Sequence, residues 1–267
     1  MTRPLYLIPF AAVLLFTATR AAEAQLEGIQ YARGQDVAPA FEGWGRNPDG
    51  TRSLYFGYMN RNHEEEVDIP IGPDNRIDPG GDQGQPTHFY ARRQRAVFKI
   101  VVPNDWDPQR KIAWSLTVHG KTNSAKGWLQ PEWELNDEIL MENSGGATDL
   151  DNKAPTVTGT GPQTVIFPNP VTLSVSAQDD GLPRPRRRQA EGDGSAGRDG
   201  VRVRWIEYRG PGAVLFDPDS TDPVYGKQVT STTQATFSSP GVYVLRAIVG
   251  DGSLETFHDV TVSVKPR

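Results

Sequence analysis

Residues 112–119 read IAWSLTVH, and this stretch indicates the fold class because every second side chain is apolar. Successive side chains of a β-strand point to opposite faces, so this alternation predicts a strand with one buried face and one polar face. The pattern recurs at residues 54–58, 98–102, 171–177 and 260–264. Half-buried strands of this kind are typical of antiparallel sheets. The sequence therefore predicts an all-β protein.

Turn-forming residues separate the predicted strands. The runs NPDG at 47–50 and GPDN at 72–75 follow apolar stretches, and the chain contains 27 Gly and 22 Pro. Short strands divided by such runs are typical of sandwiches. Residues 136–143 alone predict a helix, with Asn136 as the N-cap.

The first residues have the layout of a secretory signal peptide. Arg3 is followed by an apolar run at 5–16 and by Ala22-Glu23-Ala24, a small-x-small cleavage pattern before Gln25. A membrane anchor is the alternative, but a spanning helix needs about 20 apolar residues. We expect residues 1–25 to be removed. The mature chain, with no transmembrane segment, is then expected to be secreted or to lie in the periplasm or at the extracellular surface.

The composition limits what can hold the fold together and what it binds. The chain has no Cys, so neither disulfides nor thiolate metal sites are expected. Its formal net charge is −5, whereas nucleic-acid binding requires a broad basic surface. We therefore expect no nucleic-acid partner.

The polar run ENSGGATDLDNKAP at 142–155 marks a change in composition. Five of the six Trp lie before it, and only Trp205 follows. Small polar residues without periodicity are typical of linkers. We predict two consecutive β-sandwich domains, an aromatic-rich one at 26–145 and a second at 153–267, joined by a linker at 146–152.

The second half carries a series of short motifs in a recognisable order. They are Asn152, Ala154 and Pro155, the run AQDDG at 177–181, Trp205, the run TFSSPGVYVL at 236–245, Gly250-Asp251-Gly252 and the closing strand at 260–264. In these motifs the chain resembles the polycystic-kidney-disease (PKD) and immunoglobulin-like modules of bacterial surface and secreted proteins. The W-D-F-G-D-G block of strict PKD repeats is missing, so only the broader sandwich class carries over. The resemblance implies a spacer, an adhesive unit or an accessory binding domain.

Trp205 and Tyr243 have expected structural roles in such a sandwich. A Trp in the middle of a strand is expected to fill the space between the two sheets, and a Tyr after a Pro-Gly turn is expected to bind nearby backbone through its hydroxyl. The first half resembles an uncharacterised domain of other exported bacterial proteins, which implies no activity. The strings that carry this resemblance are FEGW at 41–44, YMNRN at 58–62, DIPIGP at 68–73 and GQPTHF at 84–89.

Local catalytic motifs are not found in the sequence. The run GSAG at 194–197 has Asp193 where a G-x-S-x-G elbow needs Gly, and HEEEV at 63–67 lacks the second His of a zinc-protease helix. We assign no catalytic residue and expect a protein that is not an enzyme. A hydrolase with paired carboxylates from distant strands stays open, because such pairs leave no local pattern.

Calcium is the one cofactor that the sequence suggests. Calcium takes six to eight oxygen ligands, and Asp side chains in loops commonly supply them. The candidate ligands lie in predicted loops of the second half. They are Asp179, Asp180, Asp217, Asp219 and Asp251. The alternative is that Asp-Gly and Asp-Pro pairs simply form turns.

Four Trp of the first half are candidates for stacking against sugar rings, because each lies beside turn residues. They are Trp44, Trp106, Trp128 and Trp133. Trp114 is expected in the core, and the alternative for the other four is also packing.

We therefore predict an exported, non-catalytic envelope or secreted protein that acts as a binding, adhesive or structural module. Its partner would be a protein or glycan of the cell envelope. The first alternative is a carbohydrate-binding accessory protein, and the second is the hydrolase.

Overall fold

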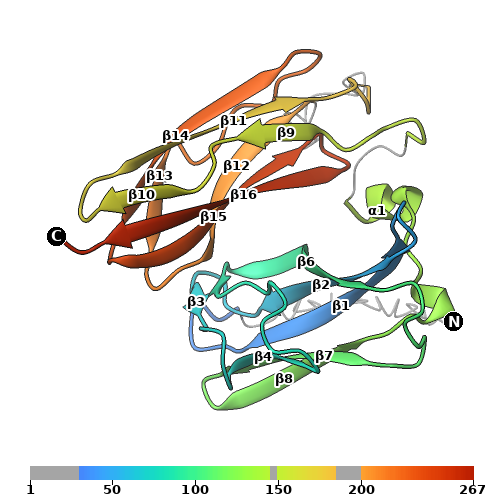
Figure 1. Cartoon of the computed structure of the whole chain (residues 1–267). Helices are drawn as coiled ribbons and strands as arrows, with labels where there is room; N and C mark the ends of the chain where they lie inside the picture. The colour runs from blue at the N-terminus through green and yellow to red at the C-terminus, as the bar shows by residue number, and fades with distance from the viewer. Residues whose placement is uncertain (1–29, 145–148, 185–199) are drawn as a thin grey trace, which may run out of the picture. The chain divides into compact units, whose positions relative to one another are not determined.

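The computed structural model describes residues 30–144, 149–184 and 200–267, which form sixteen β-strands and two short helices. Strands dominate the described chain, which confirms the all-β prediction (Figure 1). The expected signal peptide, residues 1–25, lies outside the described ranges, as does the start of the linker at 146–152. Both stay predictions, and so does the division into domains at 26–145 and 153–267.

The N-terminal sheets are built from β1 to β8. One antiparallel sheet has the order β1-β2-β6, from β1 (Val37–Arg46), β2 (Arg52–Asn60) and β6 (Arg92–Val102). A second antiparallel sheet has the order β4-β7-β8, from β4 (Asn75–Asp78), β7 (Ile112–Val118) and β8 (Lys121–Gly127). A two-stranded ladder joins β3 (Val67–Asp68) to β5 (His88–Phe89).

Trp114 lies at the centre of the N-terminal core and is fully buried, as predicted. It comes from β7, and its ring meets Phe98 of β6 edge-on at 4.9 Å and Phe56 of β2 at 6.3 Å. The indole N–H donates to Asn75 Oδ1 at 3.0 Å, so the polar end of the ring is also satisfied. One side chain therefore links the two larger N-terminal sheets.

The C-terminal sheets are built from β9 to β16. One sheet has the order β10-β16-β15-β12, from β10 (Gln163–Ile166), β16 (Glu255–Lys265), β15 (Gly241–Gly250) and β12 (Arg202–Arg209). The other has the order β13-β14-β11-β9, from β13 (Val214–Asp217), β14 (Val229–Phe237), β11 (Val171–Gln178) and β9 (Thr156–Gly159). The pairing of β10 with β16 is parallel, and the other pairings are antiparallel.

The two aromatic residues expected to hold the C-terminal sandwich do so. Trp205 of β12 is 2% exposed and donates to Ser231 Oγ of β14 at 3.0 Å, across to the facing sheet. Tyr243 is fully buried, and its hydroxyl donates to the carbonyl oxygen of Ser239 at 2.8 Å. The predicted bridge between sheets and the predicted tie of the tyrosine hydroxyl to nearby backbone are both confirmed.

The helices are short. A 3-10 turn, η1 (Pro131–Trp133), precedes α1 (Asp137–Ser144), and Asn136 Oδ1 accepts a hydrogen bond from the Ile139 N–H at 2.9 Å. This is the N-cap that the sequence predicted. Within the described ranges, no helix has the length and apolar character required to cross a membrane.

Replacing either buried Trp is expected to destabilise the protein strongly. Trp114→Ala or Trp205→Ala should each cost about 3–5 kcal/mol in free energy of unfolding, because the change empties a large buried volume. Chemical denaturation measures this. Trp133→Ala is the control, because Trp133 is 44% exposed. This variant should lose much less free energy of unfolding than the two core variants. Parent-like unfolding of both core variants would contradict the core assignment.

Candidate functional site

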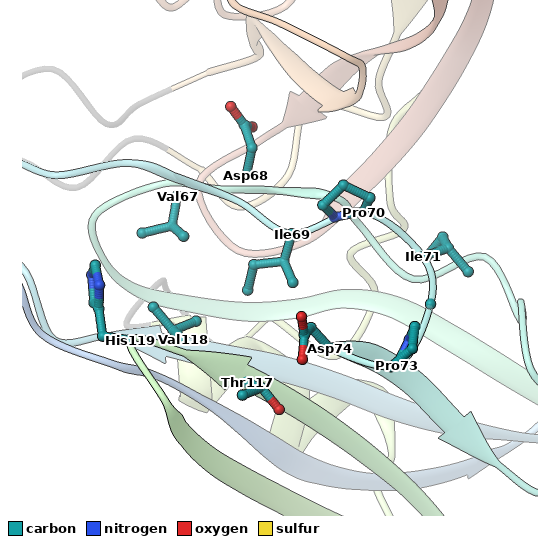
Figure 2. A pocket seen from close by; sticks show the side chains of 11 residues that line it. Val67, Asp68, Ile69, Pro70, Ile71, Pro73, Asp74, Thr117, Val118 and His119 are labelled. Atoms are coloured by element: carbon teal, nitrogen blue, oxygen red, sulfur yellow. The ribbon is translucent and has the colours of Figure 1, made fainter.

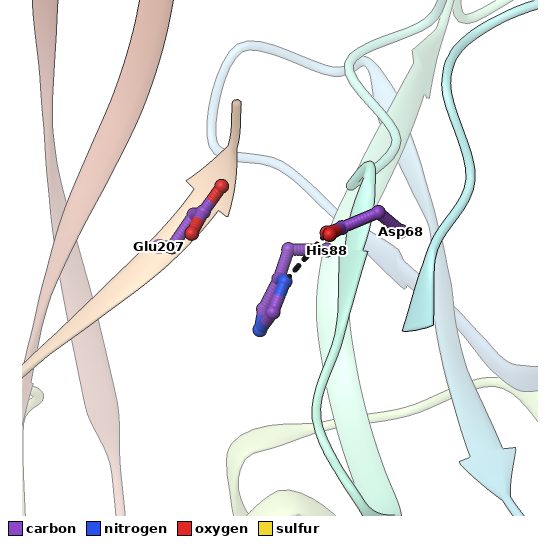
Figure 3. Close-up of side chains that lie close together, drawn as sticks. All are labelled: Asp68, His88 and Glu207. Atoms are coloured by element: carbon purple, nitrogen blue, oxygen red, sulfur yellow. Dashed lines mark hydrogen bonds and ion pairs between the residues drawn. The ribbon is translucent and has the colours of Figure 1, made fainter. Parts of the chain in front are cut away.

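Three titratable side chains from three strands meet beside β5. Asp68 of β3, His88 of β5 and Glu207 of β12 each offer one metal-ligating atom, and these atoms all lie within 4.8 Å of one another (Figure 3). Glu66, two residues before Asp68, contributes a further carboxylate to His88. We call Glu66, Asp68, His88 and Glu207 the His88 cluster. His88 is 8% exposed and Glu207 2%, so its centre is shielded from solvent.

The short β3–β5 ladder positions the histidine between two carboxylates. Its register places Asp68 directly opposite His88. The neighbouring Phe89 is fully buried in the N-terminal core, and strand alternation therefore directs His88 to the other face of the ladder. His88 Nδ1 lies 2.7 Å from Asp68 Oδ1, and Nε2 lies 3.1 Å from Glu66 Oε2.

Tyr90 holds the histidine and the glutamate in place together. Its ring packs edge-on against His88 with 4.6 Å between ring centroids. Its hydroxyl accepts a hydrogen bond from the Glu207 backbone N–H at 2.9 Å. The pairing of β12 with β15 shifts register between Glu207 and Arg209, which marks a β-bulge where β12 reaches the cluster. Bulges of this kind redirect side chains.

The residues after Glu207 secure this approach. Arg209 makes two hydrogen bonds to the Asp82 carboxylate, at 2.7 and 3.0 Å, and donates from Nε to the carbonyl oxygen of Gln85 at 2.7 Å. The hydroxyl of Tyr208 donates to the carbonyl oxygen of Gly84. The backbone at Glu207 is therefore held beside His88 by the contacts of the next two residues.

The electrostatics of the cluster favour a bound positive charge. Burial disfavours the charged imidazole, but hydrogen bonds to Asp68 and Glu66 and the charge of Glu207 overcome this and raise the pKa of His88 to about 9. Burial raises the pKa of Glu207 to about 7, against the opposing effect of the His88 charge. Glu207 Oε1 is buried and has no hydrogen-bond partner in the described part of the chain. Three carboxyl groups thus surround one cation.

A separate shallow depression of about 400 Å³ lies on the other side of β3. It is lined by residues 67–74 and by residues 117–119. Figure 2 shows Val67 and Ile69 directed into the depression and Asp68 directed away from it. The depression and the His88 cluster therefore share Asp68 but lie on opposite sides of the same short strand.

Three of the five predicted calcium ligands come together at one end of the C-terminal sandwich. Asp179 is half-buried. Burial raises the pKa of its carboxyl group, and the charges of Asp251 and Asp180 raise it further. Asp251 is 2% exposed, and its Oδ1 accepts from the N–H groups of Ser253 and Leu254. Asn152, which the sequence analysis did not propose as a ligand, donates to Asp251 Oδ2 at 3.1 Å.

The other two predicted ligands lie elsewhere on the C-terminal sheets. Asp217 is the last residue of β13, and Asp219 lies in the loop that follows. The carbonyl oxygen of Asp219 accepts a hydrogen bond from the backbone N–H of Trp205 at 2.7 Å. Both side chains are exposed. Calcium binding by either one stays a prediction.

The four candidate sugar-binding Trp have different surroundings. Trp44 is 4% exposed and donates to the carbonyl oxygen of Gln130, so its ring is part of the core. Trp106 is half-buried beneath Arg110. Trp128 is half-buried and Trp133 exposed, and both rings lie nearly parallel to Phe41, at centroid distances of 6.4 and 5.5 Å. Carbohydrate binding stays a prediction.

The residue pattern did not predict the His88 cluster. Its members lie on strands far apart in the sequence, so no motif of fixed spacing indicates them. Alternation along β5 could have placed Phe89 inward and His88 outward, but nothing local indicates that β12 brings Glu207 to this point.

Comparisons with known proteins concern the fold alone. No protein-family model matches the chain, and no curated protein gives a match. The solution structure of the PKD domain from human KIAA0319 matches with a TM-score of 0.23 and 17% identity, covering 45% of this chain and 90% of that one. The D00-D0 domain of intimin matches with a TM-score of 0.28 and 10% identity, covering 86% of this chain and 99% of that one.

Fibronectin(III)-like modules of CbhA from Clostridium thermocellum match with a TM-score of 0.25 and 12% identity, covering 86% of this chain and 95% of theirs. PKD-like and fibronectin-like sandwich modules are thus among the structures that this chain resembles, in agreement with the resemblance seen in the sequence. Superpositions this loose carry no conclusion about function.

Stability is expected to fall as the pH rises, because both His88 and Glu207 bind protons more tightly in the folded state. The contribution of Glu207 is complete below its ordinary pKa of 4.5 and is lost as the pH rises through about 7. That of His88 is complete below 6.5 and is lost through about 9. Thermal melting between pH 5 and 10, with a chelator present, measures both losses.

Two variants separate the contributions to this profile. Glu207→Gln should flatten the profile chiefly between pH 4.5 and 7, and His88→Gln chiefly between 6.5 and 9. If the His88→Gln protein follows the parent above pH 6.5, the assigned role of His88 is wrong.

Proposed function

We propose that this protein is an exported, non-catalytic binding or structural module of the cell envelope or secretome, in which calcium orders one end of the C-terminal sandwich. Its partner is a protein or glycan of the envelope. The calcium ligands are Asn152, Asp179 and Asp251, with Asp180 at the rim.

The observation that carries the calcium proposal is a pair of buried oxygens without partners. Asn152 Oδ1 and Asp179 Oδ1 are buried and receive no hydrogen bond within the described ranges. Asn152 is 5% exposed, and its amide nitrogen already donates to Asp251. An unsatisfied buried oxygen costs about 1–3 kcal/mol. Calcium is bound by oxygen ligands from carboxylates and side-chain amides, so it would remove this cost.

The position of these groups explains what calcium would do for a module. Asn152 precedes β9, Asp179 follows β11, and Asp251 lies between β15 and β16. The Lys153 N–H also donates to Asp180 Oδ2 at 3.1 Å. Calcium here would join loops from both C-terminal sheets and fix the segment that leads into β9.

A non-catalytic role is supported by the surroundings of the carboxylates. A glycosidase needs two carboxyl groups about 5–10 Å apart on either side of the scissile bond. The carboxylates of the His88 cluster instead enclose a histidine that is 8% exposed. The hydrolase alternative therefore has less support than the binding module.

Calcium should raise the melting temperature of the full chain, and a chelator should reverse the shift. Asp179→Asn removes a ligand charge but keeps the shape, so it should abolish most of the calcium shift. Asp222→Asn, at an exposed position in the loop between β13 and β14, is the matched control and should keep it. An unchanged melting temperature of the parent with and without calcium would remove calcium from the proposal.

Carbohydrate binding is the second candidate, and the exposure of Trp133 favours it. Its ring is 44% exposed and supported by a nearly parallel Phe41, an arrangement that leaves one flat face for an apolar sugar face. Calorimetric titration with a panel of soluble glycans should detect binding by the parent and by Trp133→Phe, which keeps an aromatic ring at this position. Binding should disappear for Trp133→Ala. Absence of binding by the parent throughout the panel would count against this candidate.

A further inference from the structure

We infer that Asp68, His88 and Glu207 form a binding site for a divalent transition metal, for which zinc is the best fit. This site is independent of the calcium site proposed above, because the two share no residue.

The geometry of the His88 cluster is close to that of a zinc site. Its three ligand atoms lie within 4.8 Å of one another on β3, β5 and β12. Ligands of tetrahedral zinc lie about 3.4 Å apart, given bond lengths of about 2.1 Å. Small side-chain movements of Asp68 and Glu207 would close this difference. Figure 3 shows the three side chains converging on one region.

Glu207 gives independent support for a missing cation. Glu207 is only 2% exposed to solvent. Its Oε1 atom has no hydrogen-bond partner in the described ranges. Buried charges in proteins are normally paired or coordinate metals. His88 is already shared between Asp68 and Glu66, which leaves Glu207 with the weakest compensation in the cluster.

The donor set discriminates between metals. Imidazole together with carboxylates suits zinc, whereas calcium and magnesium take oxygen ligands alone. Histidine binds metal only in its neutral form, so zinc would compete with protons for His88. Tyr90 packs on the imidazole and would limit the orientation of the ring, as groups around metal-bound histidines usually do.

The consequence would be a crosslink between distant parts of the chain. Asp68 and His88 belong to the β3–β5 ladder, and Glu207 belongs to β12 of the C-terminal sheets. A chain without cysteine cannot form a disulfide there. Zinc at this position would connect these strands in its place, so the site is structural in the folded protein.

The test is zinc titration of the full chain, freed of metal by chelation, followed by calorimetry and thermal melting. One zinc should bind per chain, and the melting temperature should rise by about 5–10 °C at a hundredfold excess over Kd. Glu207→Gln should fold and melt at or above the parent temperature without metal, because it removes a buried charge, but it should lose the zinc shift. That separates loss of the ligand from loss of the fold.

Two controls test the specificity of this result. Glu64→Gln makes the same chemical change at an exposed position, and His119→Gln removes an exposed histidine. Both should keep the parent zinc shift. The proposal is overturned if zinc leaves the parent unchanged, if Glu207→Gln keeps its full zinc affinity, or if His119→Gln abolishes the binding. Calcium should act on Glu207→Gln as on the parent, so failure of one site is distinguishable from failure of the other.

Discussion

Aromatic rings that pass between facing sheets are the interaction on which the described structure depends. With no cysteine in the chain, no disulfide crosslinks the sheets. Trp114 joins β7 to Phe98 of β6, and Trp205 joins β12 to Ser231 of β14. Each indole also satisfies its N–H with a buried acceptor, so the ring has one stable orientation.

Strand β12 extends this principle, because it contributes to two cores. Trp205 lies in the C-terminal core, whereas Tyr208, three residues later, is buried with the N-terminal core residues. Arg246 lies 3.6 Å above the Tyr208 ring and pairs with Asp259. Trp205 and Tyr208 are three positions apart, so alternation along β12 places their side chains on opposite faces of the strand.

The two proposed cation sites share one physical cause. Burial of a carboxylate or amide oxygen is costly unless a hydrogen bond or a cation compensates for it. Around Asp179 the neighbouring groups are carboxylates, a side-chain amide and backbone, which suits a hard ion. Around Glu207 a histidine is present, which suits zinc. Because the donor sets differ, the two proposed sites would select different metals without thiolate ligands.

The sequence by itself determined the all-β class, the Trp114 and Trp205 positions, the N-cap at Asn136 and the acidic loops near Asp179. These features follow from alternation and turn chemistry, which are local and leave a pattern in neighbouring residues. Only the tertiary structure decided that Asn152 joins those loops, that Trp44 is buried and that Glu207 reaches His88. Such contacts unite strands far apart in the chain, and their register depends on packing that no local pattern encodes.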